Sequence, residues 1–118
     1  MYNILPETKD HIIVIRIEGY TNSQDIKTLL PYLTHRIKKH GKIRILVILK
    51  EVSGIEMFGF LKTIPFFFKY RKIIEKKAIL TDEIWVYKWT NIFKSLFNTK
   101  IHCFPSYELV KAWEWLEK

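Results

Sequence analysis

The side chains that could act as metal ligands or nucleophiles are four histidines and one cysteine: His11, His35, His40, His102 and Cys103. Zinc sites use close pairs such as CxxC or HxxxH, whereas the spacing of His35 and His40 turns them away from a common helical face. His102 and Cys103 are neighbours in a predicted strand and should point to opposite faces of its sheet. We expect a structural or surface role for all five residues and no bound metal.

Acid–base and phosphate-binding chemistry also lacks a recognisable arrangement. The carboxylates of the apolar middle region show no spacing that singles out a general acid and a general base: Glu51, Glu56, Glu75, Asp82 and Glu83. The four glycines stand apart at positions 19, 41, 54 and 59, so the sequence contains no glycine-rich phosphate loop. We therefore predict that the protein is not an enzyme and needs no cofactor.

Apolar and aromatic side chains are concentrated in two neighbouring segments. In residues 55–72 (IEMFGFLKTIPFFFKYRK), apolar residues recur at the i, i+3, i+4, i+7 spacing of a helix, and further aromatic residues extend beyond that face. A second apolar segment runs from Trp85 to Phe97. Two helices with more apolar surface than one core face can hide must cover it with each other, a ligand, a partner or lipid. These aromatic side chains could equally complete the core.

The charge balance is strongly basic, with a formal net charge of +8. Residues 42–80 hold nine Lys and Arg against three Asp and Glu, so most of the excess lies in the middle third. This surplus suits anionic headgroups, nucleic acid or acidic proteins, and a solvated lysine-rich surface explains it equally well. With one cysteine, no apolar run of about 20 residues and no secretory leader, we expect a cytoplasmic protein.

The hydrophobic pattern and the turn residues predict one α/β domain over residues 1–118 with the element order ββαβαβαβα. We expect strands at 2–5, 11–18, 43–49, 77–80 and 100–104, and helices at 23–40, 55–72, 83–97 and from 105 onward. Gly19 should end the second strand, and Pro65 should kink the second helix or start a new piece of it. In the last helix, Leu109, Val110, Trp113 and Leu116 should point inward. The sheet should have five mostly parallel strands and an antiparallel N-terminal edge strand.

This pattern resembles the SpoIIAA-like group of STAS-domain proteins, sometimes grouped with SEC14/CRAL-TRIO-like lipid-binding domains. The resemblance covers nearly the whole chain. It rests on HGKIRILVIL before the first aromatic helix, KYRK leading into KKAIL, the aromatic helix from Trp85 to Phe97, and the terminal AWEWLEK. It implies a small cytoplasmic module that binds a partner or an apolar ligand and performs no chemistry.

One departure from that family bears on regulation. In STAS-type anti-sigma-factor antagonists, an Asp-Ser-Ser-Gly-like motif at the strand-to-helix loop carries a phosphorylated serine. The aligned positions here are Glu56, Met57, Phe58 and Gly59, which include no hydroxyl group. Ser53 lies in the preceding loop, outside the motif position. We therefore expect no phosphoserine switch.

Two functional hypotheses follow. In the first, the second and third helices hold an apolar or lipid-like ligand under a flap hinged at Pro65 and the Ser53–Gly54 loop, or bind the inner face of an anionic membrane peripherally. The ligand- or membrane-facing residues would be Met57, Phe58, Phe60, Leu61, Ile64, Phe68, Trp85, Trp89 and Phe93. Lys69, Arg71 and Lys72 would bind anionic headgroups, each contributing about 1 kcal/mol.

The second hypothesis belongs to a different class of function. The same apolar face would serve a regulatory protein-interaction module, either by docking a partner protein or by forming a homodimer. Nucleic acid ranks below lipid as a partner, because the chain carries none of the sequence signatures of the common nucleic-acid-binding modules.

Overall fold

The structure, a computed structural model, describes residues 2–4, 11–21, 23–55, 65–97 and 100–118. The strands are β1 (Tyr2–Ile4), β2 (Ile12–Thr21), β3 (Ile43–Ile55), β4 (Ile74–Leu80) and β5 (Lys100–Phe104). The helices are α1 (Ser23–His40), α3 (Ile84–Phe97) and α4 (Leu109–Glu117). Residues 65–69 are also helical. The helix predicted over 55–72 is wrong at both described ends, because Ile55 ends β3 and residues 70–73 form turns, and residues 56–64 lie outside the described residues.

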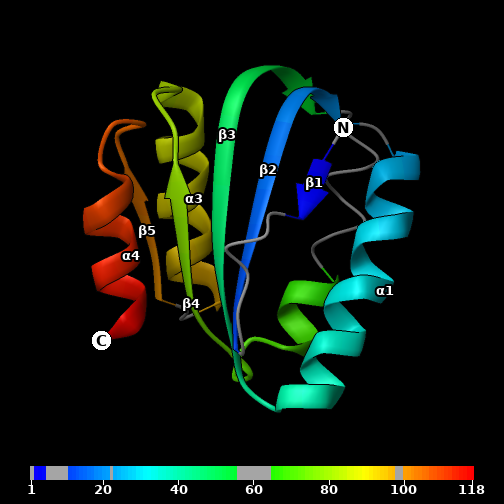
Figure 1. The fold of residues 1–118 in the computed structure, drawn as a ribbon. Coiled ribbons are helices and arrows are strands. Elements are labelled where there is room, and N and C mark those ends of the chain that lie inside the picture. Colours follow the sequence, from blue (N-terminus) through cyan, green and yellow to red (C-terminus); the bar gives the residue numbers. More distant parts are fainter. Residues whose placement is uncertain (1, 5–10, 22, 56–64, 98–99) are drawn as a thin grey trace.

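The five strands form one mixed sheet in the order β1-β2-β3-β4-β5. β1 is antiparallel to β2, and the other three pairs are parallel. The β-branched residues of β2 and β3 lie side by side, with Ile13 opposite Ile45 and Ile15 opposite Val47. Figure 1 shows the sheet with its helices to either side. The predicted fold class is confirmed.

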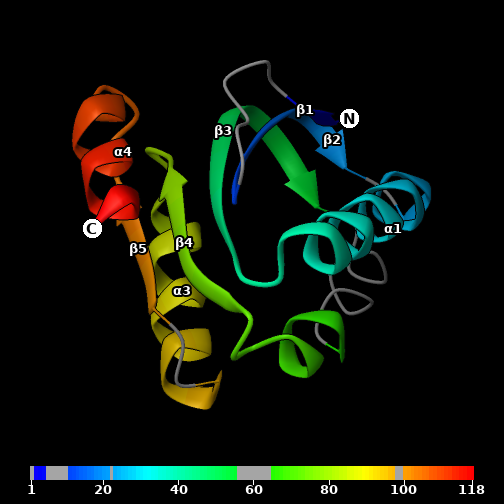
Figure 2. The ribbon, with the colours of Figure 1, turned by 60° about the horizontal axis from the view of Figure 1, so that its bottom comes forward.

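Two buried clusters occupy the two faces of the sheet. On one face, α1, residues 65–70 and α3 pack against alternate residues of β2, β3 and β4. α1 contributes Leu29, Leu33 and Ile37, which follow the spacing of a helix face. On the other face, α4 contributes Ala112 and Leu116 to a cluster with the remaining alternate strand residues. Figure 2 shows α4 on the opposite side of the sheet from α1 and residues 65–69.

Several predicted boundaries are wrong. β2 does not end at Gly19, because that glycine adopts a positive φ of 66° at a register shift and the strand continues to Thr21. β3 extends six residues past Leu49, and β4 begins at Ile74 rather than Lys77. The stop at Gly41 is confirmed: its φ is 81° and its N–H donates to the Ile37 carbonyl (2.7 Å).

The orientation predicted for the start of the last helix is also wrong. Val110 is exposed and Leu109 is half exposed, whereas Ala112 and Leu116 are fully buried. The buried face of α4 is therefore set by an alanine, which lets the helix approach the sheet closely. Val110 lies two residues before Ala112 and so points away from the sheet, at about 100° of rotation per residue.

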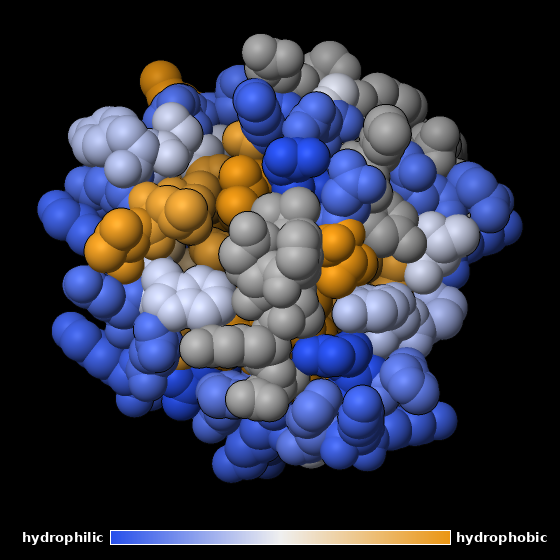
Figure 3. Space-filling model, in the orientation of Figure 1, coloured by the Kyte–Doolittle hydropathy of each residue, from blue (hydrophilic) through white to orange (hydrophobic). Residues whose placement is uncertain are grey.

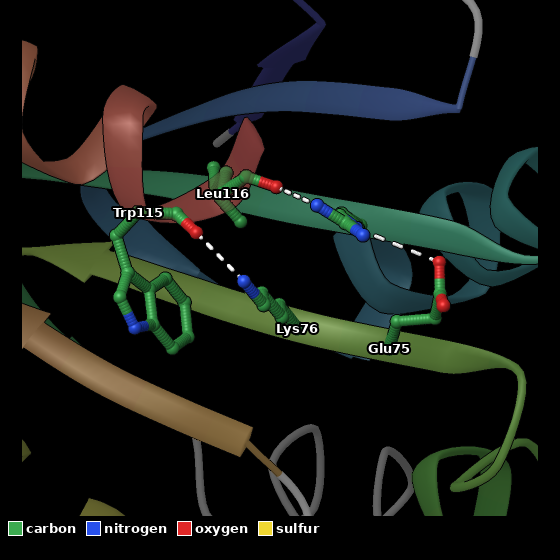
Figure 4. A network of polar contacts seen from close by, with 5 residues as sticks. Glu75, Lys76, Trp115 and Leu116 are labelled. Carbon is green, nitrogen blue, oxygen red and sulfur yellow. Dashed lines mark hydrogen bonds and ion pairs between the residues drawn. The ribbon is translucent and has the colours of Figure 1, made fainter. Parts of the chain in front are cut away.

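Basic side chains from two strands bind the C-terminal turn of α4 (Figure 4). Lys76 Nζ donates to the Trp115 carbonyl (2.9 Å), and Arg44 Nη1 donates to the Leu116 carbonyl. Arg44 Nε also lies 3.5 Å from Glu75 Oε1. Because the last carbonyls of a helix have no partner within it and carry partial negative charge, these cations stabilise the docked helix. None of the described helices is long and apolar enough to cross a membrane.

Candidate functional site

A threonine between β4 and α3 joins the start of the helix to the end of the strand. Thr81 is fully buried, its Oγ1 accepts a hydrogen bond from the Glu83 N–H (3.0 Å), and its carbonyl accepts one from the Tyr87 hydroxyl (3.1 Å). Further along, Val86 and Thr90 are buried one turn apart, so they define the inward face. Thr90 Oγ1 accepts a bond from the Cys103 thiol of β5 (3.3 Å), which satisfies this polar inward position.

A second apolar face of α3 remains exposed. Trp85, Trp89 and Ile92, here called the α3 stripe, have exposed fractions of 37%, 44% and 49%. They follow i, i+4, i+7 spacing and therefore lie along one side of the helix. Because they are rotated from the Val86–Thr90 face, a single packing surface against the sheet cannot hide both. The α3 stripe is therefore an exposed apolar surface along one side of the helix.

Residues 65–73 combine aromatic packing with a fixed cation. Phe66 and Phe67 are half-buried, and the Phe66 ring lies 5.4 Å from the Phe67 ring and 4.9 Å from the Tyr70 ring. Phe68 is 50% exposed. The Arg71 guanidinium lies 4.3 Å from the centre of the Phe68 ring, and its Nη1 donates to the Phe68 carbonyl (2.8 Å). Phe68 and Arg71 thus form an exposed aromatic–cation pair.

The predicted site residues are only partly described by the structure. Phe68, Trp85 and Trp89 are exposed as a binding surface requires. The other predicted residues of the second helix lie outside the described residues: Met57, Phe58, Phe60, Leu61 and Ile64. Phe93 lies in α3, but its side chain is not among those described. The apolar cavity between the two helices stays a prediction.

The predicted headgroup anchor lies beside the exposed aromatic residues. Lys69 and Lys72 are exposed, and Lys69 Nζ lies 5.3 Å from the Tyr70 ring, whereas Arg71 is held on Phe68. Residues 65–73 and 84–97 together contain five cations and no carboxylate: Lys69, Arg71, Lys72, Lys88 and Lys94. The two segments that carry the exposed aromatic residues are therefore both apolar and basic.

A second exposed cluster was not predicted from the sequence. Ile84, Tyr107, Leu109 and Val110 lie where β4 and β5 end and α3 and α4 begin, and we call them the carboxyl-edge patch. Tyr107 and Val110 are 82% and 69% exposed. The composition of the loop around these residues was the feature of the sequence that could have indicated their exposure. Apolar periodicity instead assigned Leu109 and Val110 to the core.

The cysteine and histidines take structural or surface positions. Burial raises the pKa of the Cys103 thiol, which the hydrogen bond to Thr90 and the nearby Lys77 and Lys94 partly offset. A raised pKa reduces the thiolate fraction and disfavours nucleophilic chemistry. His102 packs on the other face of the sheet, 4.4 Å from the Phe104 ring and 5.8 Å from the Trp115 ring. Within the described ranges, no group of three His, Cys, Asp or Glu side chains is placed to hold a metal ion.

Comparisons with known proteins agree with this architecture. A family model described as SpoIIAA-like matches residues 12–117. An uncharacterized protein of the DUF3478 family from Shewanella loihica PV-4, with a SpoIIAA-like fold, superposes with a TM-score of 0.79 and 16% identity, covering 98% of this chain and 92% of that one. The anti-sigma factor antagonist SpoIIAA in its unphosphorylated form superposes with a TM-score of 0.70 and 10% identity, covering 97% and 98%. No curated protein matches the sequence.

Proposed function

The chain belongs to the SpoIIAA-like family, and we propose that it is a non-catalytic module that binds a partner protein through the α3 stripe. One protein of the same fold is named an anti-sigma factor antagonist, a protein that acts on another protein. At 10% identity that likeness concerns the fold alone, so the surface of this chain must support the proposal. The observation that carries it is the exposure of Trp85, Trp89 and Ile92 along one side of α3.

The shape and composition of the stripe suit a helical partner. α3 has 14 residues and is therefore about 21 Å long. Tryptophan is enriched among the residues that contribute most to protein–protein affinity, and i, i+4, i+7 anchors are the pattern used when one helix packs along another. The Arg71–Phe68 pair is a second exposed aromatic group, carried by a segment that packs on the same face of the sheet as α3.

The charges indicate the chemistry of the partner. Residues 65–73 and 84–97, the two segments that carry the exposed aromatic side chains, contain five cations and no carboxylate. A partner with Asp and Glu beside its apolar face would be attracted and oriented by them. A symmetric homodimer through this face would instead oppose the cations of the two copies. We therefore propose an acidic amphipathic helix as the partner, and a homodimer through this face is disfavoured.

Binding to an anionic membrane is the competing function, because exposed tryptophans beside lysines also suit a headgroup interface. A binding experiment with lipid vesicles distinguishes protein binding from membrane binding. A protein-binding module should bind an acidic peptide helix and leave anionic vesicles free, whereas a peripheral membrane protein should co-sediment with anionic vesicles in a salt-sensitive manner.

The test uses two synthetic amphipathic peptides of about 20 residues, which share one apolar face and differ only in carrying Glu or Lys on the polar face. We expect the Glu peptide to bind and to change the tryptophan fluorescence, and the Lys peptide to bind at least about tenfold more weakly. Trp89→Ala should weaken binding of the Glu peptide by about tenfold or more. Lys27→Glu, at an exposed position on α1, is the matched control. Equal binding of both peptides, or binding to vesicles alone, would overturn the proposal.

A further inference from the structure

Two nucleophilic side chains that the proposed function does not use lie on the neighbouring strands β4 and β5. In the register of these strands, Lys77 lies opposite Ile101, two residues before Cys103. Lys77 and Cys103 are therefore diagonal neighbours, and alternation along each strand places both side chains on one face of the sheet. Strand spacing and rise separate such positions by about 8 Å at Cα, a distance that a lysine side chain can span.

This face of the sheet is covered by α3 and residues 65–70. The Lys77 ammonium lies 4.1 Å from the centre of the Phe67 ring, and the Cys103 thiol donates to the Thr90 hydroxyl of α3 (3.3 Å). Figure 1 shows α3 behind β4, so both groups lie on the side of the molecule that is turned away from the viewer in Figure 3. Each side chain is partly exposed, which admits a small reagent rather than another protein.

The surroundings keep the lysine amine available for reaction. Burial lowers the pKa of Lys77 to about 8, an effect that Cys103 partly opposes, so a large share of the amine is neutral and nucleophilic at about pH 8. Within the part of the chain that the structure describes, neither a hydrogen bond nor an ion pair holds this amine. Burial raises the pKa of the Cys103 thiol, whereas Thr90, Lys77 and Lys94 lower it. The thiol therefore reacts slowly unless an oxidant is supplied.

We propose that a peroxide joins Cys103 to Lys77 through a sulfur–nitrogen bond, which makes this pair a site of reversible oxidative modification. In the first step the thiolate attacks hydrogen peroxide. A sulfur–oxygen bond forms, the oxygen–oxygen bond breaks, and the hydroxide that leaves takes up a proton to become water. The sulfur is oxidised by two electrons to a sulfenic acid, and the peroxide is reduced by the same two electrons.

The second step is a condensation without further oxidation. The neutral Lys77 amine attacks the sulfenic acid sulfur, the sulfur–nitrogen bond forms and the sulfur–oxygen bond breaks. The hydroxide that leaves takes the proton that the amine gives up, as in the known condensation of a sulfenic acid with a nitrogen. The protein thereby loses two hydrogen atoms in total. The new bond joins β4 to β5, removes the charge of Lys77 and replaces its contact with the Phe67 ring.

The test treats the full chain with hydrogen peroxide at about pH 8 and measures the mass of the denatured protein. We expect a product lighter by about 2 Da, restored by a thiol reductant, and a crosslinked peptide that contains Lys77 and Cys103 after proteolysis. The chain has one cysteine, so a disulfide within one molecule cannot account for this loss. A doubled mass, or oxygen added to Cys103 without the crosslink, would overturn the proposal.

Lys77→Arg is the discriminating variant, because arginine keeps a cation beside the thiol and has no nucleophilic amine. Its thiol should gain oxygen atoms without losing two hydrogen atoms. Lys94→Arg is the matched control: Lys94 is exposed and its charge also acts on Cys103, so this variant should form the bond as the unmodified protein does. A loss of two hydrogen atoms that persists in Lys77→Arg would assign the bond to another nitrogen and refute the role of Lys77. The crosslinked peptide of the unmodified chain identifies the amine independently of any variant.

Discussion

The ammonium group of Lys77 lies 4.1 Å from the centre of the Phe67 ring. Lys77 belongs to β4, and Phe67 belongs to residues 65–69, so this cation–π contact joins the second helix to the sheet. Burial lowers the pKa of Lys77 to about 8, an effect that the nearby Cys103 partly opposes. The contact therefore holds a charged group at a desolvated position beneath the helix.

This lysine should make the stability of the protein depend on pH in a defined window. Its pKa is about 8 in the folded state, against an ordinary lysine value of 10.5, so between these values the unfolded chain binds more protons. The free energy of unfolding should then rise with pH across this window by at most about 3 kcal/mol. Below the window Lys77 is charged in both the folded and the unfolded state, so the folded state bears the whole cost of burying that charge. Urea unfolding at about pH 7 and at about pH 10 measures the change.

Lys77→Met isolates this contribution. Cys103 and Tyr87 have raised pKa values through burial, so their ionisation opposes the trend of Lys77 as the pH rises. Methionine keeps the length of the side chain and packs against aromatic rings without a charge. The difference in unfolding free energy between wild type and variant should shrink or reverse toward high pH. A difference that stays constant over the window would show that Lys77 is not desolvated.

The sequence was sufficient for the fold where local pattern and packing agree. Leu29, Leu33 and Ile37 follow helix spacing and are buried, and the β-branched runs of β2 and β3 form the central strands. It was insufficient at the start of β4, where Glu75, Lys76 and Lys77 precede the apolar residues. These charged side chains are accommodated by Arg44, by carbonyls of α4 and by the Phe67 ring. No local pattern contains those contacts.

The candidate site, like the fold, could be predicted from the sequence only in part. The sequence identified α3 as carrying too much apolar surface, but it could not give the rotation of the helix about its axis. Thr90 faces the sheet because the Cys103 thiol donates to its hydroxyl, so a polar residue takes an inward position. Trp89, one residue before Thr90, is 44% exposed, and apolar periodicity alone does not predict this exchange of an aromatic for a polar inward residue.

The Thr90–Cys103 bond should control the reactivity of the thiol. Burial already raises the pKa of Cys103, and the Thr90 hydroxyl opposes this because it can rotate and donate to the thiolate once the thiol has lost its proton. In Thr90→Val the pKa of Cys103 should rise further, and the reaction with a disulfide reagent should slow at a given pH. The measurement is the reaction rate against pH. Thr90→Ser keeps the hydroxyl and should stay close to wild type; a faster reaction in Thr90→Val than in Thr90→Ser would contradict the bond.

The cations that bind the end of α4 should contribute to stability unequally. Arg44→Leu removes the donor to the Leu116 carbonyl and leaves Glu75 without its cation, so we expect a loss of about 2 kcal/mol. Lys76→Met should cost about 1 kcal/mol, because desolvation and repulsion from Arg44 already lower the pKa of Lys76. Lys27→Met, at an exposed position on α1, is the control. Urea unfolding followed by tryptophan fluorescence measures the loss of stability in each variant. A larger loss for Lys76→Met than for Arg44→Leu would contradict the larger contribution expected of Arg44.

The two faces of α3 should separate folding from binding. Val86 is buried against the sheet, so Val86→Ala should destabilise the protein by about 1 to 3 kcal/mol while leaving the exposed residues in place. Ile92→Ala, on the exposed side of the same helix, should change stability by less than about 0.5 kcal/mol yet weaken binding of the acidic peptide. Urea unfolding and peptide titration on the same two variants check both halves. If Ile92→Ala destabilised the fold as much as Val86→Ala, the α3 stripe would be part of the core, and the surface on which the proposed function depends would be lost.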